Sequence, residues 1–391
     1  MASISFNLSS AVLEWARKSM GYSLEQAAKK IGVPNERYEA WEKGEKLPTY
    51  KQLEELAEKV YKRPLAILLL KTPPTENPIK KDFRNLSNAE ITNLSPDLRV
   101  ALRKAKRYQL ILEEVASTEE PPKFKQFKIS ITDNPLDAAR KLRELLDLSL
   151  EEQKSWKPET SFGNFRRLIE SFGVYIFLMK LPIEEARAFC ITGDFPIIVL
   201  NKDDSKYATI FSIFHELCHI LLNQNDVFKD VQKGNLSKEY KEIELFCNLF
   251  SAAFLVPEDS FNKNVEYLKL VKDNISDSQI QKLAYTYNVS NEVIARKLLT
   301  RRLISEDFFW GRKRFWDSMA KSAKERANEK RKDEDPHGIN QGIKLIHEKG
   351  RPYVANVVNA YQKGFISSAD LSNYLETKFN HLPKILERLN A

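Results

Sequence analysis

The residues best suited to chemistry stand together as His215-Glu216-Leu217-Cys218-His219, an HExxH pattern. Residues four apart lie on one face of a helix, so the imidazoles of His215 and His219 can both reach one zinc ion at about 2.0–2.1 Å. Glu216 lies between them, where it can act as the general base of a metal-assisted peptide hydrolysis. The chain has only 5 histidines, and two of them in this arrangement favour a zinc site over a pair that merely packs on a helix.

A catalytic zinc site also needs a third protein ligand and one position for water. Glu244 is the leading candidate, because Asn248 follows it by one helical turn and can orient the ligand through a hydrogen bond. Glu242 is the rival third ligand, although the residue one turn after it is the apolar Phe246. The sequence therefore predicts His215, His219 and a downstream glutamate as the metal ligands.

The cysteines are few, with 3 in the chain, and this number cannot complete a disulfide framework. We therefore expect a reducing compartment. Cys218 and Cys247 flank the expected ligands, but buried packing is a commoner role for free cysteine than metal ligation or sensing. The other histidines are isolated in the sequence, and one of them could fold back toward the reacting carbonyl oxygen. These are His337, His347 and His381.

The elements that must position the site change character along the chain. Helical periodicity covers 207–222, which carries the HExxH pattern, and 243–255, which Pro257 ends. Before them, 133–146 and 162–172 are also helical in pattern. Three short β-branched or aromatic runs, typical of strands, lie between the two pairs of helices: 175–179, 186–191 and 197–200. This order predicts an α+β domain with a small sheet.

Composition and length set the frame for these elements. The chain has 391 residues, enough for two or three domains, and its 42% hydrophobic and 30% charged residues exclude a wholly disordered protein. The apolar runs are far shorter than the roughly 20 residues of a membrane helix, and the N-terminus does not have the pattern of a secretory signal. We expect a cytoplasmic protein with no membrane partner. The net charge of +8 permits nucleic-acid binding without requiring it.

The N-terminal part has the pattern of a helix-turn-helix module. Ser23 is a suitable N-cap for a helix that runs to Ile31, Gly32 allows a tight turn, and Pro34 begins a second helix that runs to Lys43. Several prolines interrupt the helical pattern after the module, and the charged stretch at 97–114 is typical of one exposed helix. The expected domains are 1–72, an all-α helix-turn-helix domain; 73–125, a linker and brace helix; 126–300, the peptidase domain; and 301–391, a charged helical region.

The sequence leaves two alternatives for what the helix-turn-helix module binds, DNA or a protein. Asn35, Arg37 and Tyr38 on the second helix are the expected contacts to operator DNA. Three acidic residues on the same helix oppose the phosphate backbone: Glu36, Glu39 and Glu42. The module therefore either reads DNA or binds a protein, such as the partner that the peptidase cleaves.

Three further segments suggest structure more than chemistry. Residues 280–294 have a second helix-turn-helix-like pattern, which we interpret as structural. Residues 312–332 are heavily charged, as expected of a solvated helix face. The tail from 350 to 391 resembles a small helical unit.

Together these motifs resemble the ImmA/IrrE family of zinc metallopeptidases, over roughly 162–257. The similarity rests on these segments: Arg187-Ala188-Phe189, Pro196 to Asn201, Phe211 to Leu222, Glu244 to Asn248, and Phe254 to Pro257. The resemblance implies a zincin-like fold and one zinc ion per chain, held by His215, His219 and Glu244, with Glu216 catalytic. Family members commonly cleave a repressor or antitoxin encoded beside them, so it also implies such a protein substrate.

The N-terminal module resembles the Xre/Cro-type DNA-binding fold over about 13–70. Two functional hypotheses follow from the combined pattern. The first is a zinc endopeptidase that a helix-turn-helix domain regulates. The second is a DNA-binding repressor or antitoxin in which the peptidase domain serves as a sensor or scaffold with little turnover.

Overall fold

The computed structural model describes residues 8–75, 94–116, 122–183, 185–222, 236–272, 274–316, 318–319 and 341–390. Contacts divide the chain into two compact units, residues 1–107 with 184–186, and residues 108–183 with 187–391. The division falls inside α7 (Pro96–Val115). Among the described residues, no helix has both the length and the apolar character that a membrane crossing requires.

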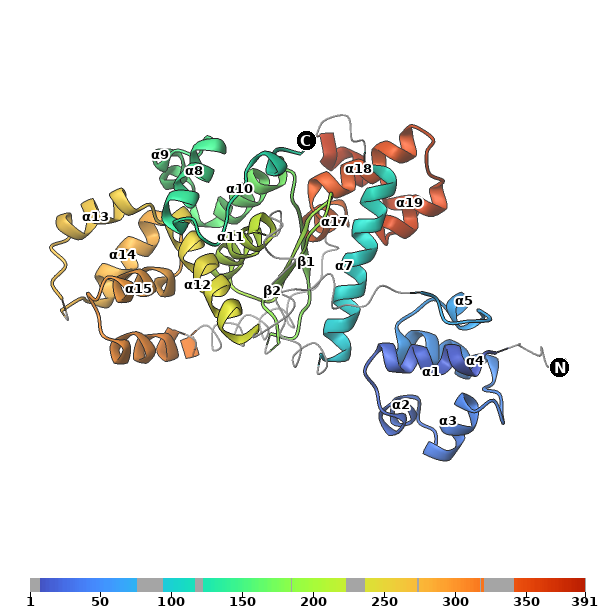
Figure 1. Ribbon diagram of the computed structural model, residues 1–391. Helices are drawn as coiled ribbons and strands as arrows, with labels where there is room; N and C mark the ends of the chain where they lie inside the picture. Colours follow the sequence, from blue (N-terminus) through green and yellow to red (C-terminus); the bar gives the residue numbers. More distant parts are fainter. Residues whose placement is uncertain are drawn as a thin grey trace, which may run out of the picture. The chain divides into compact units, whose positions relative to one another are not determined.

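The first unit is helical throughout its described part (Figure 1). Helix α1 packs on α3 and on a π-helical turn, η1. Its elements before α7 are α1 (Ser10–Ser19), α2 (Leu24–Ile31), α3 (Asn35–Glu42), α4 (Tyr50–Glu55), η1 (Leu56–Tyr61) and α5 (Leu65–Leu68).

The helix-turn-helix follows from its capping residues, as the sequence predicts. The Ser23 hydroxyl accepts a hydrogen bond from the Gln26 backbone N–H, and the Gln26 side chain accepts one from the Ser23 N–H. This capping box begins α2. Gly32 ends it in the left-handed conformation, with φ +73°, and Pro34 is the N-cap of α3.

The second unit is built around a three-stranded sheet of order β1-β3-β2. Strand β1 (Tyr175–Met179) is parallel to β3 (Ile197–Asn201), and β2 (Ala188–Ile191) is antiparallel to β3. The three predicted strands are thus confirmed, with β2 beginning two residues later than expected and β3 ending one residue later.

Helices account for most of the rest of this unit. Before the sheet come the 3₁₀ turn η3 (Lys123–Gln126), α8 (Pro135–Leu145), α9 (Leu150–Ser155) and α10 (Pro158–Ser171). After it come α11 (Lys206–Leu222), α12 (Leu236–Leu255), α13 (Glu258–Tyr267), α14 (Asp277–Tyr287), α15 (Asn291–Thr300), α17 (Gln341–Lys349), α18 (Arg351–Gln362), α19 (Ser368–Leu375), η6 (Phe379–His381) and α20 (Leu382–Asn390). The second helix-turn-helix-like pattern corresponds to α14 and α15, joined at Asn288. Most of the charged stretch at 312–332 lies outside the described residues.

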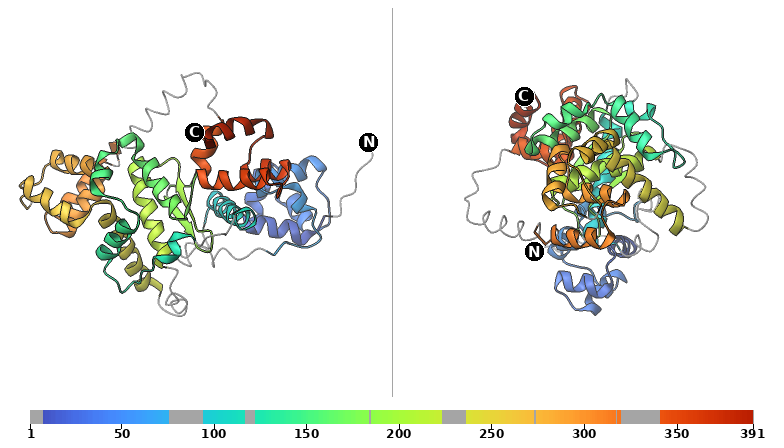
Figure 2. Two further views of the ribbon diagram at one scale, coloured as in Figure 1. Left: turned by 90° about the horizontal axis from the view of Figure 1, so that it is seen from above. Right: turned by 90° about the vertical axis from the view of Figure 1, so that its left-hand side faces the viewer.

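Helices cover both faces of the sheet. Successive residues of a strand point to opposite faces, so β1 contributes side chains to both layers. Ile176 and Leu178 of β1 join the core cluster that also includes residues of α10, α11 and α12. Phe177 points the other way, stacks on Tyr108 at 4.6 Å between ring centroids, and meets Tyr353 of α18 at 5.1 Å. Figure 1 shows α11 on one side of the strands and α17 and α18 on the other, and the left-hand view of Figure 2 agrees.

The C-terminal helices are fixed to the sheet by a buried ion pair. Arg166 and Glu170 of α10 pair at 2.8 Å, with side chains 7% and 5% exposed. Arg166 also donates to the backbone oxygens of Ile176 and His347. Gly350 lies against this pair with φ +83°, and a Cβ there would be 2.6 Å from a Glu170 carboxylate oxygen. Only glycine fits this close approach without strain.

Candidate metal centre and helix-turn-helix surface

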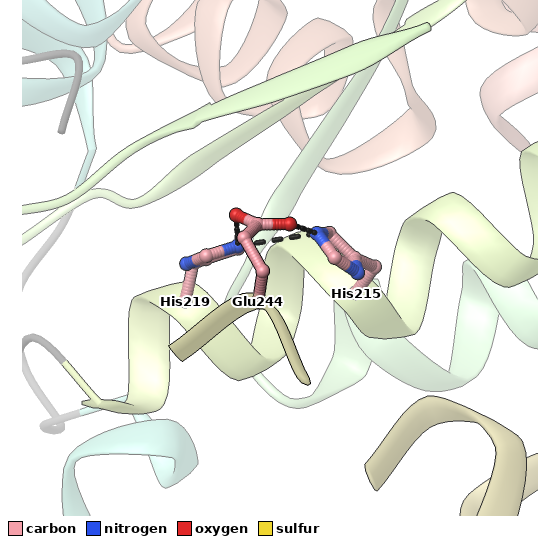
Figure 3. Close-up of side chains that lie close together, drawn as sticks. All are labelled: His215, His219 and Glu244. Atoms are coloured by element: carbon pink, nitrogen blue, oxygen red, sulfur yellow. Dashed lines mark hydrogen bonds and ion pairs between the residues drawn. The ribbon is translucent and has the colours of Figure 1, made fainter. Parts of the chain in front are cut away.

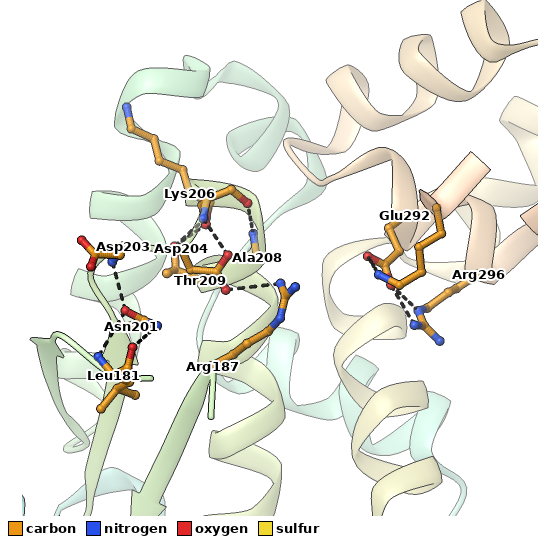
Figure 4. Close-up of polar contacts among 12 residues, drawn as sticks. Leu181, Arg187, Asn201, Asp203, Asp204, Lys206, Ala208, Thr209, Glu292 and Arg296 are labelled. Carbon is orange, nitrogen blue, oxygen red and sulfur yellow. Dashed lines mark hydrogen bonds and ion pairs between the residues drawn. The ribbon is translucent and has the colours of Figure 1, made fainter. Parts of the chain in front are cut away.

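Helix α11 carries the HExxH pattern, and the loop after β3 fixes where it begins (Figure 4). The Asn201 side chain donates to the Leu181 carbonyl at 3.0 Å and accepts from the backbone N–H of Asp203. The Ser205 hydroxyl accepts from the N–H of Ala208 at 3.2 Å, in the manner of an N-cap. The loop therefore sets the start of α11 relative to the sheet, and with it the position of both histidines.

The structure brings His215, His219 and Glu244 together, as predicted (Figure 3). The Nε2 atoms of the two histidines are 3.2 Å apart. Glu244 of α12 reaches both rings, with Oε2 at 3.3 Å from Nε2 of His215 and Oε1 at 3.2 Å from Nε2 of His219. Among the described residues this is the group whose side chains could hold a metal ion.

The spacing of these atoms matches what zinc requires. Ligand atoms at about 2.0–2.1 Å from a tetrahedral zinc ion lie roughly 3.3–3.4 Å from one another. The two imidazole Nε2 atoms, 3.2 Å apart, are close to this value, whereas Glu244 meets the two rings through different carboxylate oxygens. Two imidazoles and one carboxylate are also the donor set of many catalytic zinc sites, in which the fourth position stays open. The donor set thus fits a zinc ion, and one ligand atom from each of the three residues lies within 4.8 Å of the others.

The electrostatics of Glu244 suit a ligand that must stay ionised. Burial raises the pKa of this carboxyl, but hydrogen bonds from His215 and His219 outweigh the burial and hold the pKa well below its ordinary value. The carboxylate is therefore charged at neutral pH even without a metal. Metal ligands must be deprotonated to bind, so this ligand is ready for a cation.

His219 lies deeper than its partner, with 5% of its side chain exposed against 16% for His215. Burial lowers the pKa of His219, yet Cys247 and the carboxylates of Glu244 and Glu216 outweigh this effect and raise it well above its usual value. Burial also raises the pKa of the Cys247 thiol, so that thiol is neutral and we attribute the rise at His219 to the two carboxylates. Two carboxylates, Glu244 and Glu216, thus lie near His219 and would offset the charge of a bound cation.

Glu216 is 5% exposed and stands beside the histidines on α11. Its charge reaches the His219 ring, since it contributes to the raised pKa of that residue. Cys218 and Cys247 are buried, free thiols, and neither belongs to the metal-binding group found among the described residues. Their position agrees with packing as small hydrophobic side chains.

Two expectations about α12 have different outcomes. Glu242 is exposed, and Glu244 rather than Glu242 meets the histidines. The prediction for Asn248 is wrong: its side chain is exposed, and no hydrogen bond joins it to Glu244 in the described part of the chain. Four residues advance a helix by about 400°, so Asn248 is turned about 40° from Glu244. The packing of α12 leaves Asn248 facing solvent.

Of the other histidines, the two that the structure describes, His347 and His381, do not join the metal-binding group. His347 lies on α17, where burial and the charge of Arg166 lower its pKa. His381 lies in η6, and His337 falls outside the described residues. Phe211, which the sequence analysis did not single out, lies one turn before His215 with ring centroids 6.3 Å apart. Its signal in the sequence is the four-residue spacing that it shares with the two histidines.

The second helix of the N-terminal module presents only part of the predicted DNA surface. Asn35 and Arg37 are exposed on α3. The prediction that Tyr38 contacts DNA is wrong, because Tyr38 is only 1% exposed. Its hydroxyl lies 2.6 Å from that of Tyr61 in the core of the unit. A short helix packed on its neighbours must bury one face, and Tyr38 lies on that face. It cannot contact DNA in this fold.

The acidic residues of α3 are largely neutralised within the unit. Glu42 forms a buried ion pair with Arg17 at 2.8 Å, and Glu39 pairs with Lys43 at 2.7 Å. Glu42 therefore does not add unbalanced negative charge to the surface that Asn35 and Arg37 share. In the folded unit, these ion pairs reduce the negative charge on α3 that would repel the phosphate backbone of DNA.

Two histidines on one helix, with a carboxylate from the helix packed against it, form a group that could hold a metal ion, as in metallopeptidases with an HExxH helix. Comparison with family models agrees: residues 169–299 match the peptidase M78 family, described as an IrrE N-terminal-like domain. Residues 13–60 match a helix-turn-helix model of the Xre/Cro type. The chain thus contains an IrrE N-terminal-like peptidase domain and an N-terminal helix-turn-helix domain, and the α+β description holds. None of the curated proteins compared with the chain matches it.

Proposed function

We propose that this protein is a zinc-dependent endopeptidase that cleaves a specific repressor or antitoxin-like protein, and that its helix-turn-helix domain regulates or targets the cleavage. The observation that best supports the proposal is the convergence of His215, His219 and Glu244, each of which offers a ligand atom within 4.8 Å of the other two. The match to a peptidase family over 169–299 supports the reaction class.

In the proposed mechanism, His215, His219 and Glu244 hold the zinc ion. When bound, zinc supplies Lewis acidity to the scissile carbonyl and to the attacking water. Glu216 accepts a proton from that water at its carboxylate as the new C–O bond forms, and it passes the proton to the amine that leaves when the C–N bond breaks. Because Glu216 is 5% exposed, bulk water has little access to the proton that it carries.

The test compares metal content with cleavage in purified full-length protein. We expect about one zinc per chain in the wild type, loss of zinc in His219→Ala, and retained zinc in Glu216→Gln. On a proteome-derived peptide library, Glu216→Gln should cleave roughly 10²- to 10⁴-fold more slowly than wild type, the usual worth of a general base. Cleavage at the wild-type rate by zinc-loaded Glu216→Gln would refute the mechanism.

A second candidate is a DNA-binding repressor or antitoxin whose peptidase domain acts as a sensor or scaffold. The pairing of Glu42 with Arg17 supports it, because Arg37 and Asn35 then lie on a surface with less opposing charge. A gel shift with the promoter upstream of its own gene should be strong and salt-dependent, and Arg37→Ala should weaken it. Absence of any shift at low salt would remove this candidate.

A further inference from the structure

Helix α11 is buried on all sides but one. Most of its residues from Thr209 to Leu222 belong to the buried core. From Tyr207 to His215 the partly exposed positions are separated by pairs of buried residues, so each has another three or four residues away, and they form a single lengthwise face that ends at the metal centre. These positions are Tyr207, Ala208, Phe211, Ser212 and His215.

This face includes two aromatic residues, Tyr207 and Phe211, which we call the aromatic stripe. The Phe211 ring lies beside the His215 ring, with centroids 6.3 Å apart and an angle of 32° between the planes. Both members of the stripe pack against the core cluster from its edge, so each ring is anchored on one side and accessible on the other. Burial is the main cause that raises the pKa of the Tyr207 hydroxyl, and electrostatic interactions with Glu159 and Tyr285 raise it further.

The spacing of the stripe matches that of an extended peptide. Along a helix, four residues advance about 6 Å, so Phe211 and Tyr207 lie roughly 6 Å and 12 Å along α11 from His215. In an extended chain, side chains on the same side recur every two residues, about 6.6–6.8 Å apart. A peptide whose scissile bond lies at the metal centre, and which runs along α11, thus presents alternate side chains to Phe211 and then to Tyr207.

We propose that the aromatic stripe is a substrate subsite. It receives apolar side chains of leucine or phenylalanine size at the positions two and four residues from the scissile bond, on one side of that bond. Anchored rings recognise such side chains by buried apolar area and by ring contacts. This inference rests on the proposed endopeptidase function and adds a specificity to it.

The test uses full-length, zinc-loaded protein and a proteome-derived peptide library, with cleavage sites read by mass spectrometry. Wild type should show enrichment of apolar residues two positions from the cleaved bond on one side. Phe211→Ala should lose that enrichment and cut a leucine-containing peptide about 10- to 100-fold less efficiently in kcat/KM, while an alanine-containing counterpart changes less than about 3-fold. Phe211→Leu should recover most of the preference.

Tyr267→Ala is the matched control, because this aromatic residue of α13 is 75% exposed and lies outside the stripe. It should leave the cleavage profile unchanged, and zinc content together with a thermal melt should confirm that each variant is folded. A wild type that cleaves without apolar preference, or a folded Phe211→Ala with an unaltered profile, would overturn the subsite and leave the peptidase standing. A zinc-loaded wild type that cleaves nothing would overturn both.

Discussion

Replacement of Glu244 by glutamine should weaken zinc binding by a predictable amount. The substitution keeps the shape of the side chain but removes the charged oxygens that lie 3.2–3.3 Å from the two imidazoles. Four-ligand structural zinc sites bind with about 10–16 kcal/mol, which is about 2.5–4 kcal/mol per ligand. Because 1.4 kcal/mol is a factor of ten, Glu244→Gln should raise the Kd for zinc by roughly 10²- to 10³-fold.

The same helix offers a matched control for this prediction. Glu242→Gln removes an identical charge two residues earlier, from a side chain that is exposed. An exposed charge is screened by water and salt, so we expect less than about a 3-fold change in Kd. The assay is a competition titration of the metal-free protein with a chromophoric zinc chelator at pH 7. Equal Kd values for the two variants, or a larger effect at Glu242, would refute the assignment of Glu244 as the third ligand.

Three further predictions concern stability. Tyr38→Phe leaves the buried hydroxyl of Tyr61 without its hydrogen-bond partner and should lower the free energy of unfolding of the N-terminal unit by about 1–3 kcal/mol, measured by urea denaturation, while the result of a DNA gel shift stays as in the wild type. Gly350→Ala places a Cβ 2.6 Å from Glu170 at φ +83° and should cost at least about 1–3 kcal/mol, seen as a lower melting temperature. Burial raises the pKa of the Glu258 carboxyl, but its ion pairs with Lys297 and Arg301 outweigh burial and lower that pKa below the ordinary value of 4.5. The stabilisation from these ion pairs is therefore present above pH 4.5 and is lost as the pH falls. Glu258→Gln should lower the melting temperature more at pH 7 than at pH 3.

The sequence predicts well whatever local rules decide. The histidine pair follows from the four-residue spacing of one helix, and no distant contact is needed to place both rings on one face. Ser23 and Gly32 set the ends of α2 through capping and a left-handed residue, which are equally local. The strands were recognisable because three short β-branched or aromatic runs lie between turn residues.

Packing decides the features that the sequence left open or misplaced. Glu242 and Glu244 are two residues apart, about 200° around the helix, so only the rotation of α12 against α11 selects between them. The same rotation turns Asn248 to solvent. Tyr38 is an amphipathic side chain on a helix of eight residues, where periodicity is too brief to mark the buried face. The attachment of 341–390 to the sheet depends on Arg166, which is far away in the sequence.

The metal centre thus depends on how α12 is held against α11. Phe214, which directly precedes the first histidine, stacks on Phe254 of α12 at 4.1 Å and meets Phe165 of α10 edge-on at 5.3 Å. All three rings are fully buried. Sliding α12 by one turn would move Glu244 about 5.4 Å, well beyond the span of the ligand cluster, and would also break the ring stack. The aromatic core and the position of Glu244 therefore select the same register of α12, so the packing that stabilises this unit also holds the three candidate ligands together.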